Sequence, residues 1–178
     1  MTRHVALLGS INVGGNRLKM ADLTAAMEGA GFASVATVVA SGNVLFDHPG
    51  VADAALESRI AALVEDRLAI ATFAAVRTRA QIEAALAQSP FAGIGQDNLV
   101  HVHFLQCQPD AAAFDRLMTD HAGRGPERLA PGTRCLHIDF VDGAGNSRLT
   151  GDYIARRLGC RGTARNIRSL RRIVQAMG

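Results

Sequence analysis

The order of apolar segments in the first 78 residues constrains the fold more than any other feature of this sequence. Short runs of apolar and β-branched residues predict four strands, at 4–8, 35–40, 43–47 and 72–77. Apolar residues at helical spacing predict one helix from Met20 to Ala30 and another from Leu56 to Leu68. The resulting order, strand-helix-strand-strand-helix-strand, is typical of a ferredoxin-like unit, in which both helices cover one face of an antiparallel sheet.

A similar order follows a linking helix. Thr78 and Gln81 form a capping-box pattern that opens this helix, and Ser89-Pro90 ends it. Strands are then predicted at 99–106, 127–130 and 134–141, with a helix at 110–122 between the first two. Two helices finish the chain, the first capped by Ser147 and the second by Thr163. The second half is therefore expected to lack a clear last strand.

These patterns predict an α+β fold of two ferredoxin-like halves, of the βαββαβ type, packed into one compact unit. The predicted bounds are 1–78 for the N-terminal half, 79–98 for a helical linker and 99–178 for a C-terminal half that ends in an extra basic helix. Runs such as VALL and VATVV are apolar on both strand faces. We therefore expect the other half, or a second copy in a homodimer, to cover the faces that the helices leave open.

The composition excludes two classes of protein. Apolar residues make up 48% and charged residues 20% of the chain, which is typical of a globular protein rather than a disordered one. No apolar run approaches the roughly 20 residues that span a bilayer, and no cleavage-type site follows the N-terminus. We therefore expect a cytoplasmic protein without a membrane partner. Cys107, Cys135 and Cys160 are odd in number and lack metal-type spacing, which predicts reduced, mostly buried thiols.

A loop rich in glycine and asparagine, at 9–16, lies between the first predicted strand and the first predicted helix. Such a loop offers backbone N–H groups and a helix N-terminus to an anion. It is not a nucleoside-triphosphate loop, because Gly15 stands at the lysine position and Asn16 at the hydroxyl position, and its glycine spacing is not that of a dinucleotide-binding loop. The alternative is a turn that needs glycine at positive φ and asparagine to bind its own backbone.

Topology is expected to bring this loop beside the predicted hairpin turn at 41–42, because the first and second strands of such a unit run in the same direction. The main candidate ligand contacts are the small and neutral polar residues of both segments: Ser10, Asn12, Gly14, Gly15, Asn16, Ser41, Gly42 and Asn43. The set contains no evident general acid or base, so it favours binding of a phosphate-bearing ligand or nucleotide over hydrolysis. Thr163, Arg165 and Asn166, at the start of the last predicted helix, are further candidate contacts for a phosphate.

Arginine dominates the C-terminal part of the chain. From Arg148 onward there are eight arginines and one acid, Asp152. This imbalance favours an anionic partner, and a basic helix contacts phosphates without reading base sequence. The candidate nucleic-acid contacts are Arg156, Arg157, Arg161, Arg168, Arg171 and Arg172. The alternative is that these arginines pair with acids elsewhere in the fold.

Other titratable side chains give a weaker signal. His101 and His103 alternate with apolar residues on one predicted strand, as do His137 and Asp139 on another. If these strands are neighbours, the four side chains are expected to share one face, where they would bind Zn²⁺ or an anion or transfer protons. The alternative is a solvated face or a surface between the halves, since no spacing is diagnostic of a metal. The remaining acids are scattered and are expected at the surface: Asp47, Glu57, Asp66, Glu83, Asp97 and Glu127.

Three motifs, in order along the chain, resemble one bacterial family. The family of unknown function DUF1697 has segments similar to ALLGSINVGGNRLKMADL, to TVVASGNVLF, and to SRLTGDYIARRLG with TARNIRSLRRI. Its members carry Leu-Leu-Arg-Gly-Ile-Asn-Val-Gly-Gly, Ser-Gly-Asn-Val and Thr-x-Arg-Asn-Trp-Asn-Thr. The resemblance covers nearly the whole chain and implies no established reaction. This chain departs from the pattern at Gly9, Ser10, Ile167, Arg168 and Ser169, so a family ligand site built on those positions is expected to be altered here.

Three functions follow from these residues, in order of preference. The first is non-hydrolytic binding of a phosphate-bearing small ligand or nucleotide at the loop and the turn. The second is nonspecific nucleic-acid binding by the arginine-rich C-terminal helices, and the third is an enzyme that uses the histidine face. Nothing in the sequence indicates a cofactor.

Overall fold

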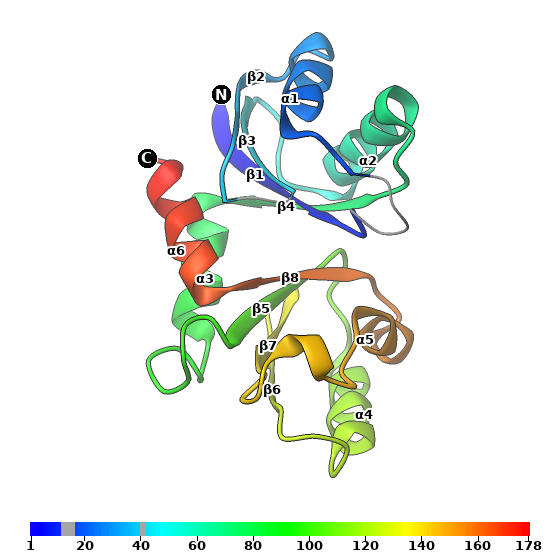
Figure 1. The fold of residues 1–178 in the computed structure, drawn as a ribbon, viewed down its shortest axis with the longest axis vertical. Coiled ribbons are helices and arrows are strands. Elements are labelled where there is room, and N and C mark those ends of the chain that lie inside the picture. The colour runs from blue at the N-terminus through cyan, green and yellow to red at the C-terminus, as the bar shows by residue number, and fades with distance from the viewer. Residues whose placement is uncertain (12–16, 40–41) are drawn as a thin grey trace. The chain divides into compact units, whose positions relative to one another are not determined.

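The computed structural model describes residues 1–11, 17–39 and 42–178 (Figure 1). The chain divides into two compact units, the first formed by Met1–Ile82 with Arg172–Gly178 and the second by Glu83–Arg171. The predicted bounds of the halves and of the linker remain a prediction. Within the described ranges, no helix is long and apolar enough to cross a membrane.

The first unit contains a four-stranded antiparallel sheet and two helices. Its elements are β1 (Thr2–Gly9), α1 (Met20–Gly29), β2 (Ala33–Thr37), β3 (Asn43–His48), α2 (Ala54–Leu68) and β4 (Phe73–Thr78). The strand order is β2-β3-β1-β4, and each pair of neighbours is antiparallel. Both helices lie on the same face of the sheet (Figure 1). The ferredoxin-like arrangement predicted for this half is therefore confirmed.

The core of the first unit lies between that face and the helices. Leu8 of β1 packs in one cluster with Met27 of α1 and Ile60 of α2. Burial of each such side chain contributes roughly 1.5–3 kcal/mol. Val5 and Leu7, which point to the opposite face of β1, are fully buried as well.

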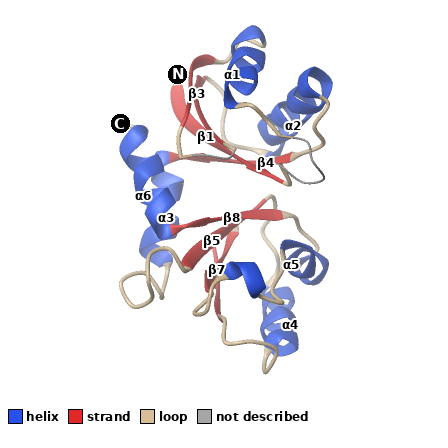
Figure 2. Cartoon of the chain, viewed as in Figure 1, coloured by secondary structure: helices blue, strands red, loops and turns tan. Residues whose placement is uncertain are grey.

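The second unit repeats the same topology (Figure 2). Its sheet elements and covering helices are β5 (Val100–Leu105), α4 (Ala111–His121), β6 (Arg128–Gly132), β7 (Cys135–Asp139), α5 (Gly151–Leu158) and β8 (Gly162–Asn166), with a short 3-10 helix at Ala144–Asn146. The strand order is β6-β7-β5-β8, again antiparallel throughout. Two helices, α3 (Arg79–Gln88) and α6 (Ile167–Ala176), each contribute residues to both units. Thr78 and Gln81 cap α3 reciprocally, as predicted.

The end of the second unit differs from the prediction. The segment at 162–166 forms the fourth strand, β8, which pairs with β5, so the last strand is present and Thr163 caps no helix. Asn166 instead caps α6, because its Oδ1 accepts a hydrogen bond from the Ser169 N–H at 2.8 Å. Thr150, and not Ser147, caps α5. β8 could not be predicted from the sequence because it is short, starts with glycine and is rich in polar residues. Its pairing with β5 shows that it is a strand.

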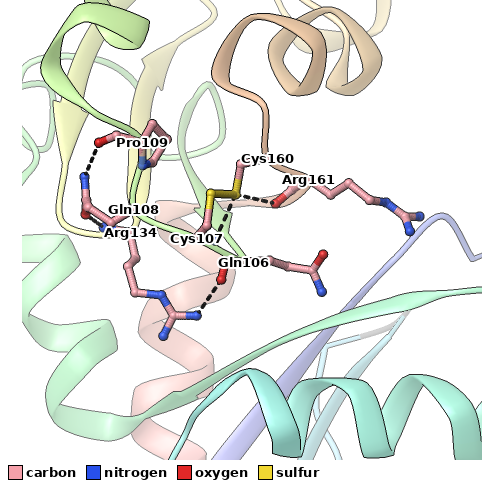
Figure 3. Close-up of a disulfide and its surroundings, with 7 residues drawn as sticks. All are labelled: Gln106, Cys107, Gln108, Pro109, Arg134, Cys160 and Arg161. Carbon is pink, nitrogen blue, oxygen red and sulfur yellow. Dashed lines mark hydrogen bonds between the residues drawn. A yellow bond between two sulfur atoms is a disulfide. The ribbon is translucent and has the colours of Figure 1, made fainter.

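The same strand pairing joins two of the cysteines. Cys107 follows β5 and Cys160 precedes β8, and these strands are direct neighbours at Leu105 and Gly162 (Figure 3). A disulfide links the two cysteines, whose Cα atoms are 6.0 Å apart. The prediction of three reduced thiols is therefore wrong for this pair. Cys135 is a buried free cysteine.

Candidate functional site

The end of β1 lies beside the connection between β2 and β3. β1 and β2 are both antiparallel to β3 and so run in the same direction. The Leu8 N–H donates to the Gly42 carbonyl at 2.8 Å, which joins the two segments directly. We call the region of Ser10, Ile11 and Gly42 the β1 edge. Of the predicted contacts, Asn12, Gly14, Gly15, Asn16 and Ser41 lie outside the described residues.

The backbone at the β1 edge has two left-handed residues. Ser10 has φ of 56° and Gly42 has φ of 81°. The φ of Gly42 favours glycine, and a Cβ atom there would lie 2.4 Å from Ile11 Cδ1, so that the Ile11 side chain would have to move. Ser10 is exposed, whereas Gly42 is buried. The strand-to-helix loop and the β2–β3 connection are therefore in tight contact where they meet.

Asn43, a predicted ligand contact, is only 1% exposed. Its side-chain amide donates to the Val39 carbonyl at 3.0 Å, and its own carbonyl accepts from the Val38 N–H at 3.1 Å. Asn43 thus forms hydrogen bonds within the β2–β3 connection, to Val38 and Val39. Its contribution to the β1 edge is to hold the backbone in place.

Two exposed cations follow the glycine-rich loop in the sequence, at the start of α1. Arg17 and Lys19 both have exposed side chains. Lys19 occupies the N-cap position of α1, and its own side chain makes no capping hydrogen bond. Free N–H groups at a helix N-terminus attract anions, and flanking cations strengthen that attraction. Neither residue was among the predicted ligand contacts, although both come just after the glycine-rich loop.

The predicted phosphate contacts of the second unit lie on β8, and only the last of them, Asn166, is also at the start of a helix. Arg165 Nη1 donates to Thr163 Oγ1 at 2.7 Å and to the Ala164 carbonyl at 2.9 Å. Burial lowers the pKa of the Arg165 guanidinium to about 10, which leaves it charged at neutral pH. Asn166 caps α6. These three residues belong to a different unit from the β1 edge.

The C-terminal arginines fall into two groups. Arg157 pairs with Asp120 at 3.1 Å and lies 3.7 Å from the centre of the Tyr153 ring, and Arg171 pairs with Asp97. The more exposed candidates are Arg156, Arg161, Arg168 and Arg172. Within the described part of the chain, Arg156, Arg168 and Arg172 form no ion pair. The alternative of pairing with acids therefore holds for Arg157 and Arg171, and nucleic-acid contact by the other arginines remains a prediction.

The histidines do not share one face, so that prediction is wrong. β5 and β7 are neighbours, but Val102 lies directly opposite His137. Directly opposite residues of antiparallel strands share a face, so His137 and Asp139 lie on one face while His101 and His103 lie on the other. The strand adjacency was predicted correctly, and the register differs by one residue from the one assumed.

Burial also affects the protonation of these histidines. It lowers the pKa of all three rings, that of His103 to about 4. The imidazoles are therefore neutral near pH 7. His101 donates from Nδ1 to the Leu99 carbonyl at 3.0 Å. Among the residues that the structure describes, no three His, Cys, Asp or Glu side chains are grouped to hold a metal ion.

Two of the acids expected at the surface are buried in polar networks. Glu57 Oε1 accepts from Arg77 Nη1 and from the Val76 N–H, each at 3.0 Å. Glu127 bonds to His121 Nε2 at 2.9 Å and to the Ser147 hydroxyl. Both acids were predicted to lie at the surface because the sequence suggests no partner for either of them, and that prediction is wrong. Both networks join separate elements within one unit and stabilise the fold there.

The comparisons with known proteins agree on the architecture. The structure resembles that of the conserved bacterial protein SP0830 from Streptococcus pneumoniae, with a TM-score of 0.70 and 20% sequence identity over 99% of this chain and 98% of that one. At this identity the likeness shows the fold alone. No curated protein matches the sequence.

A sequence profile described as "Protein of unknown function (DUF1697)" matches residues 1–137. The matched range includes the glycine-rich loop and the β2–β3 connection, and the third motif lies beyond it. Because the match covers more than half of the chain, this protein belongs to the DUF1697 family.

Proposed function

We propose that this protein binds a phosphate-bearing small ligand at the β1 edge without hydrolysing it. The observation that carries the proposal is the direct contact between the end of β1 and Gly42, through the Leu8 N–H and the Ile11 side chain. This contact joins the residues that precede the glycine-rich loop in sequence to the β2–β3 connection. Asn12, Gly14, Gly15, Asn16 and Ser41 are the proposed contacts that adjoin it in sequence.

The surrounding charges support an anionic ligand. Arg17 and Lys19 are exposed, and Lys19 is the N-cap residue of α1. Backbone N–H groups at a helix start and nearby cations together favour phosphate. Ser10, Ile11, Gly42 and Asn43 include no group that acts as a general acid or base near neutral pH. The edge therefore supports binding rather than hydrolysis.

Equilibrium dialysis with inorganic pyrophosphate and with a mixture of mononucleotides tests this function. Asn12→Leu and the double change Arg17→Ala/Lys19→Ala are each expected to weaken binding by about tenfold or more, since a hydrogen bond to a charged group contributes about 1.5–3 kcal/mol. Unchanged affinity in all of these variants would overturn the proposal.

A matched pair of glycines provides the control. Gly42→Ala is expected to weaken binding, because the new Cβ would lie 2.4 Å from Ile11 Cδ1. Gly31 has a similar φ of 87°, but no atom lies within 4 Å of its Cβ position. Gly31→Ala therefore introduces the same backbone strain without disturbing the edge, and we expect it to retain ligand affinity. Equal loss in both variants would assign the effect to strain alone.

A second candidate function is nonspecific nucleic-acid binding. The observation that favours it is the exposure of Arg156, Arg168 and Arg172 without ion pairs in the described residues. Three phosphate contacts to a single strand predict a salt slope of about −2 in log affinity against log salt. Binding of a labelled single-stranded oligonucleotide across a salt series tests it, and Arg168→Glu/Arg172→Glu should abolish most of the binding. Binding that ignores salt or this double change would exclude the arginines as the contact surface.

A further inference from the structure

The second unit has a pocket that the sequence did not indicate. Its volume is about 510 Å³, within the range of small-molecule sites. It lies where β5 ends and α4 begins, beside the turn that joins β6 to β7 and the end of α3. The lining includes Gln88, Gln108, Phe114, Asp115, Pro131 and Thr133. All of these residues belong to the second unit.

The charges at this pocket disfavour an anion. Asp115 is the ionisable member of the described lining. Asp110 stands at the N-terminus of α4 and already accepts a hydrogen bond from the Ala113 N–H at 2.7 Å, so a carboxylate occupies the place that an anionic ligand would take at this helix start. The guanidinium of Arg134 binds the Gln106 carbonyl at 3.0 Å (Figure 3). The pocket therefore favours neutral or cationic ligands, in contrast to the β1 edge.

Two glutamines hold the turn between β6 and β7, but with unequal strength. Gln108 Oε1 accepts from the Arg134 N–H at 2.6 Å, and Figure 3 shows this side chain between Arg134 and Pro109. Gln88 makes two contacts with Thr133, from its Nε2 to Oγ1 and from the Thr133 N–H to its Oε1, both 3.4 Å long. Distances of 3.4 Å lie beyond the usual length of a hydrogen bond. The Gln88 side chain is therefore held on Thr133 by longer hydrogen bonds than the one that joins Gln108 to Arg134.

The remaining walls suit a flat apolar group. Pro109, Phe114, Pro131 and Gly132 are among the lining residues without a polar side-chain group. Phe114 is 3% exposed and belongs to the core of the second unit, so its position is fixed by packing. A rigid apolar floor beside a polar contact is the usual composition of a site for a small molecule.

We propose that this pocket binds a small neutral or cationic molecule in which an amide or amidine group adjoins a flat apolar ring. The amide takes the place of the Gln88 carboxamide on Thr133, and a cationic form gains an interaction with Asp115. The ring packs against the prolines and Phe114. This site is independent of the β1 edge, which lies in the other unit and selects for negative charge.

Three matched probes test the proposal: benzamide, benzamidine and benzoate share one ring and differ in charge. Amide NMR titrations of the full chain are expected to show saturable shifts at Gly132, Thr133 and Asp115 with benzamide and benzamidine. Benzoate should bind at least about tenfold more weakly, because two carboxylates oppose it. Asp115→Asn should remove the advantage of benzamidine over benzamide and leave benzamide binding intact. Absence of shifts with every probe, or benzoate binding as tight as benzamide binding, would overturn the proposal.

Adjacent alanines in the first turn of α4 offer a blocking variant and its control. Ala111 and Ala112 are both exposed, but only Ala111 lines the pocket. Ala111→Trp should fill the pocket and abolish the probe shifts, whereas Ala112→Trp should retain them. Equal effects of the two changes would show that the probes bind elsewhere and would overturn the assignment. Pyrophosphate binding at the β1 edge should be the same in both variants.

Discussion

Replacement of Cys107 by serine is expected to destabilise the second unit by about 4 kcal/mol. The disulfide to Cys160 closes a segment with a sequence separation of 53. In the chain-entropy account, such a crosslink contributes about 3 kcal/mol for a loop of about 15 residues and about 4.7 kcal/mol for one of about 100. Cys107 is exposed, whereas Cys160 is 7% exposed and belongs to the core. Changing Cys107 therefore removes the crosslink with little loss of packing.

The chain provides its own probe for this experiment. It has one tyrosine and no tryptophan, and Tyr153 packs against the core of the second unit. Tyrosine fluorescence during urea unfolding thus reports on the unit that contains both cysteines. The oxidised wild type should unfold at higher urea than Cys107→Ser, and a reductant should lower the wild type to the level of the variant without affecting the variant.

Two results would refute this reasoning. One is an unfolding free energy of the oxidised wild type within about 0.5 kcal/mol of that of Cys107→Ser, a difference no larger than the uncertainty of the extrapolation. The other is the titration of three thiols in the unfolded, unreduced chain, where the structure predicts one, from Cys135.

Three further perturbations follow from buried or crowded positions. Glu57→Ala should lower the free energy of unfolding in urea by about 3–5 kcal/mol, because it removes the carboxylate that pairs with buried Arg77, whereas Asp47→Ala removes a partly exposed pair and should have a much smaller effect. Gly162→Ala should lower the melting temperature, because its Cβ would lie 2.7 Å from a backbone oxygen, whereas Gly151→Ala meets nothing within 4 Å and should be neutral or stabilising. His103 is neutral when folded, with its pKa lowered by burial from 6.5 to about 4, so the unfolded chain binds more protons and stability should fall as pH drops from 6.5 to 4. His103→Gln should flatten that part of the curve of stability against pH, and an unchanged slope would contradict the assignment.

The architecture could be predicted from the sequence because local patterns agree with it. Helical spacing placed α1 and α2, and apolar runs placed the strands of the first unit. β8 could not be found in this way, because Gly162, Arg165 and Asn166 have little intrinsic preference for a strand and pairing with β5 holds them extended. The Cys107–Cys160 disulfide was missed for the same reason, since it depends on that pairing.

The candidate site shows a similar limit. Topology alone predicted that the loop after β1 meets the β2–β3 connection, and the contact of Leu8 with Gly42 lies there. The register of β5 against β7 could not be predicted from the sequence. A shift of one residue moves a side chain to the other face of the sheet, and such a shift separates His103 from His137. The pocket of the second unit was missed because Gln88 and Thr133 are 45 residues apart and neither carries a motif.

An amide NMR titration of the full chain with inorganic pyrophosphate tests the proposed function most directly. We predict saturable shifts at Ser10, Ile11 and Gly42, with an affinity that falls less steeply between about 50 mM and about 200 mM salt than the affinity for a single-stranded oligonucleotide. Shifts confined to Arg156, Arg168 and Arg172 that vanish at the higher salt concentration, with none at the β1 edge, would contradict it.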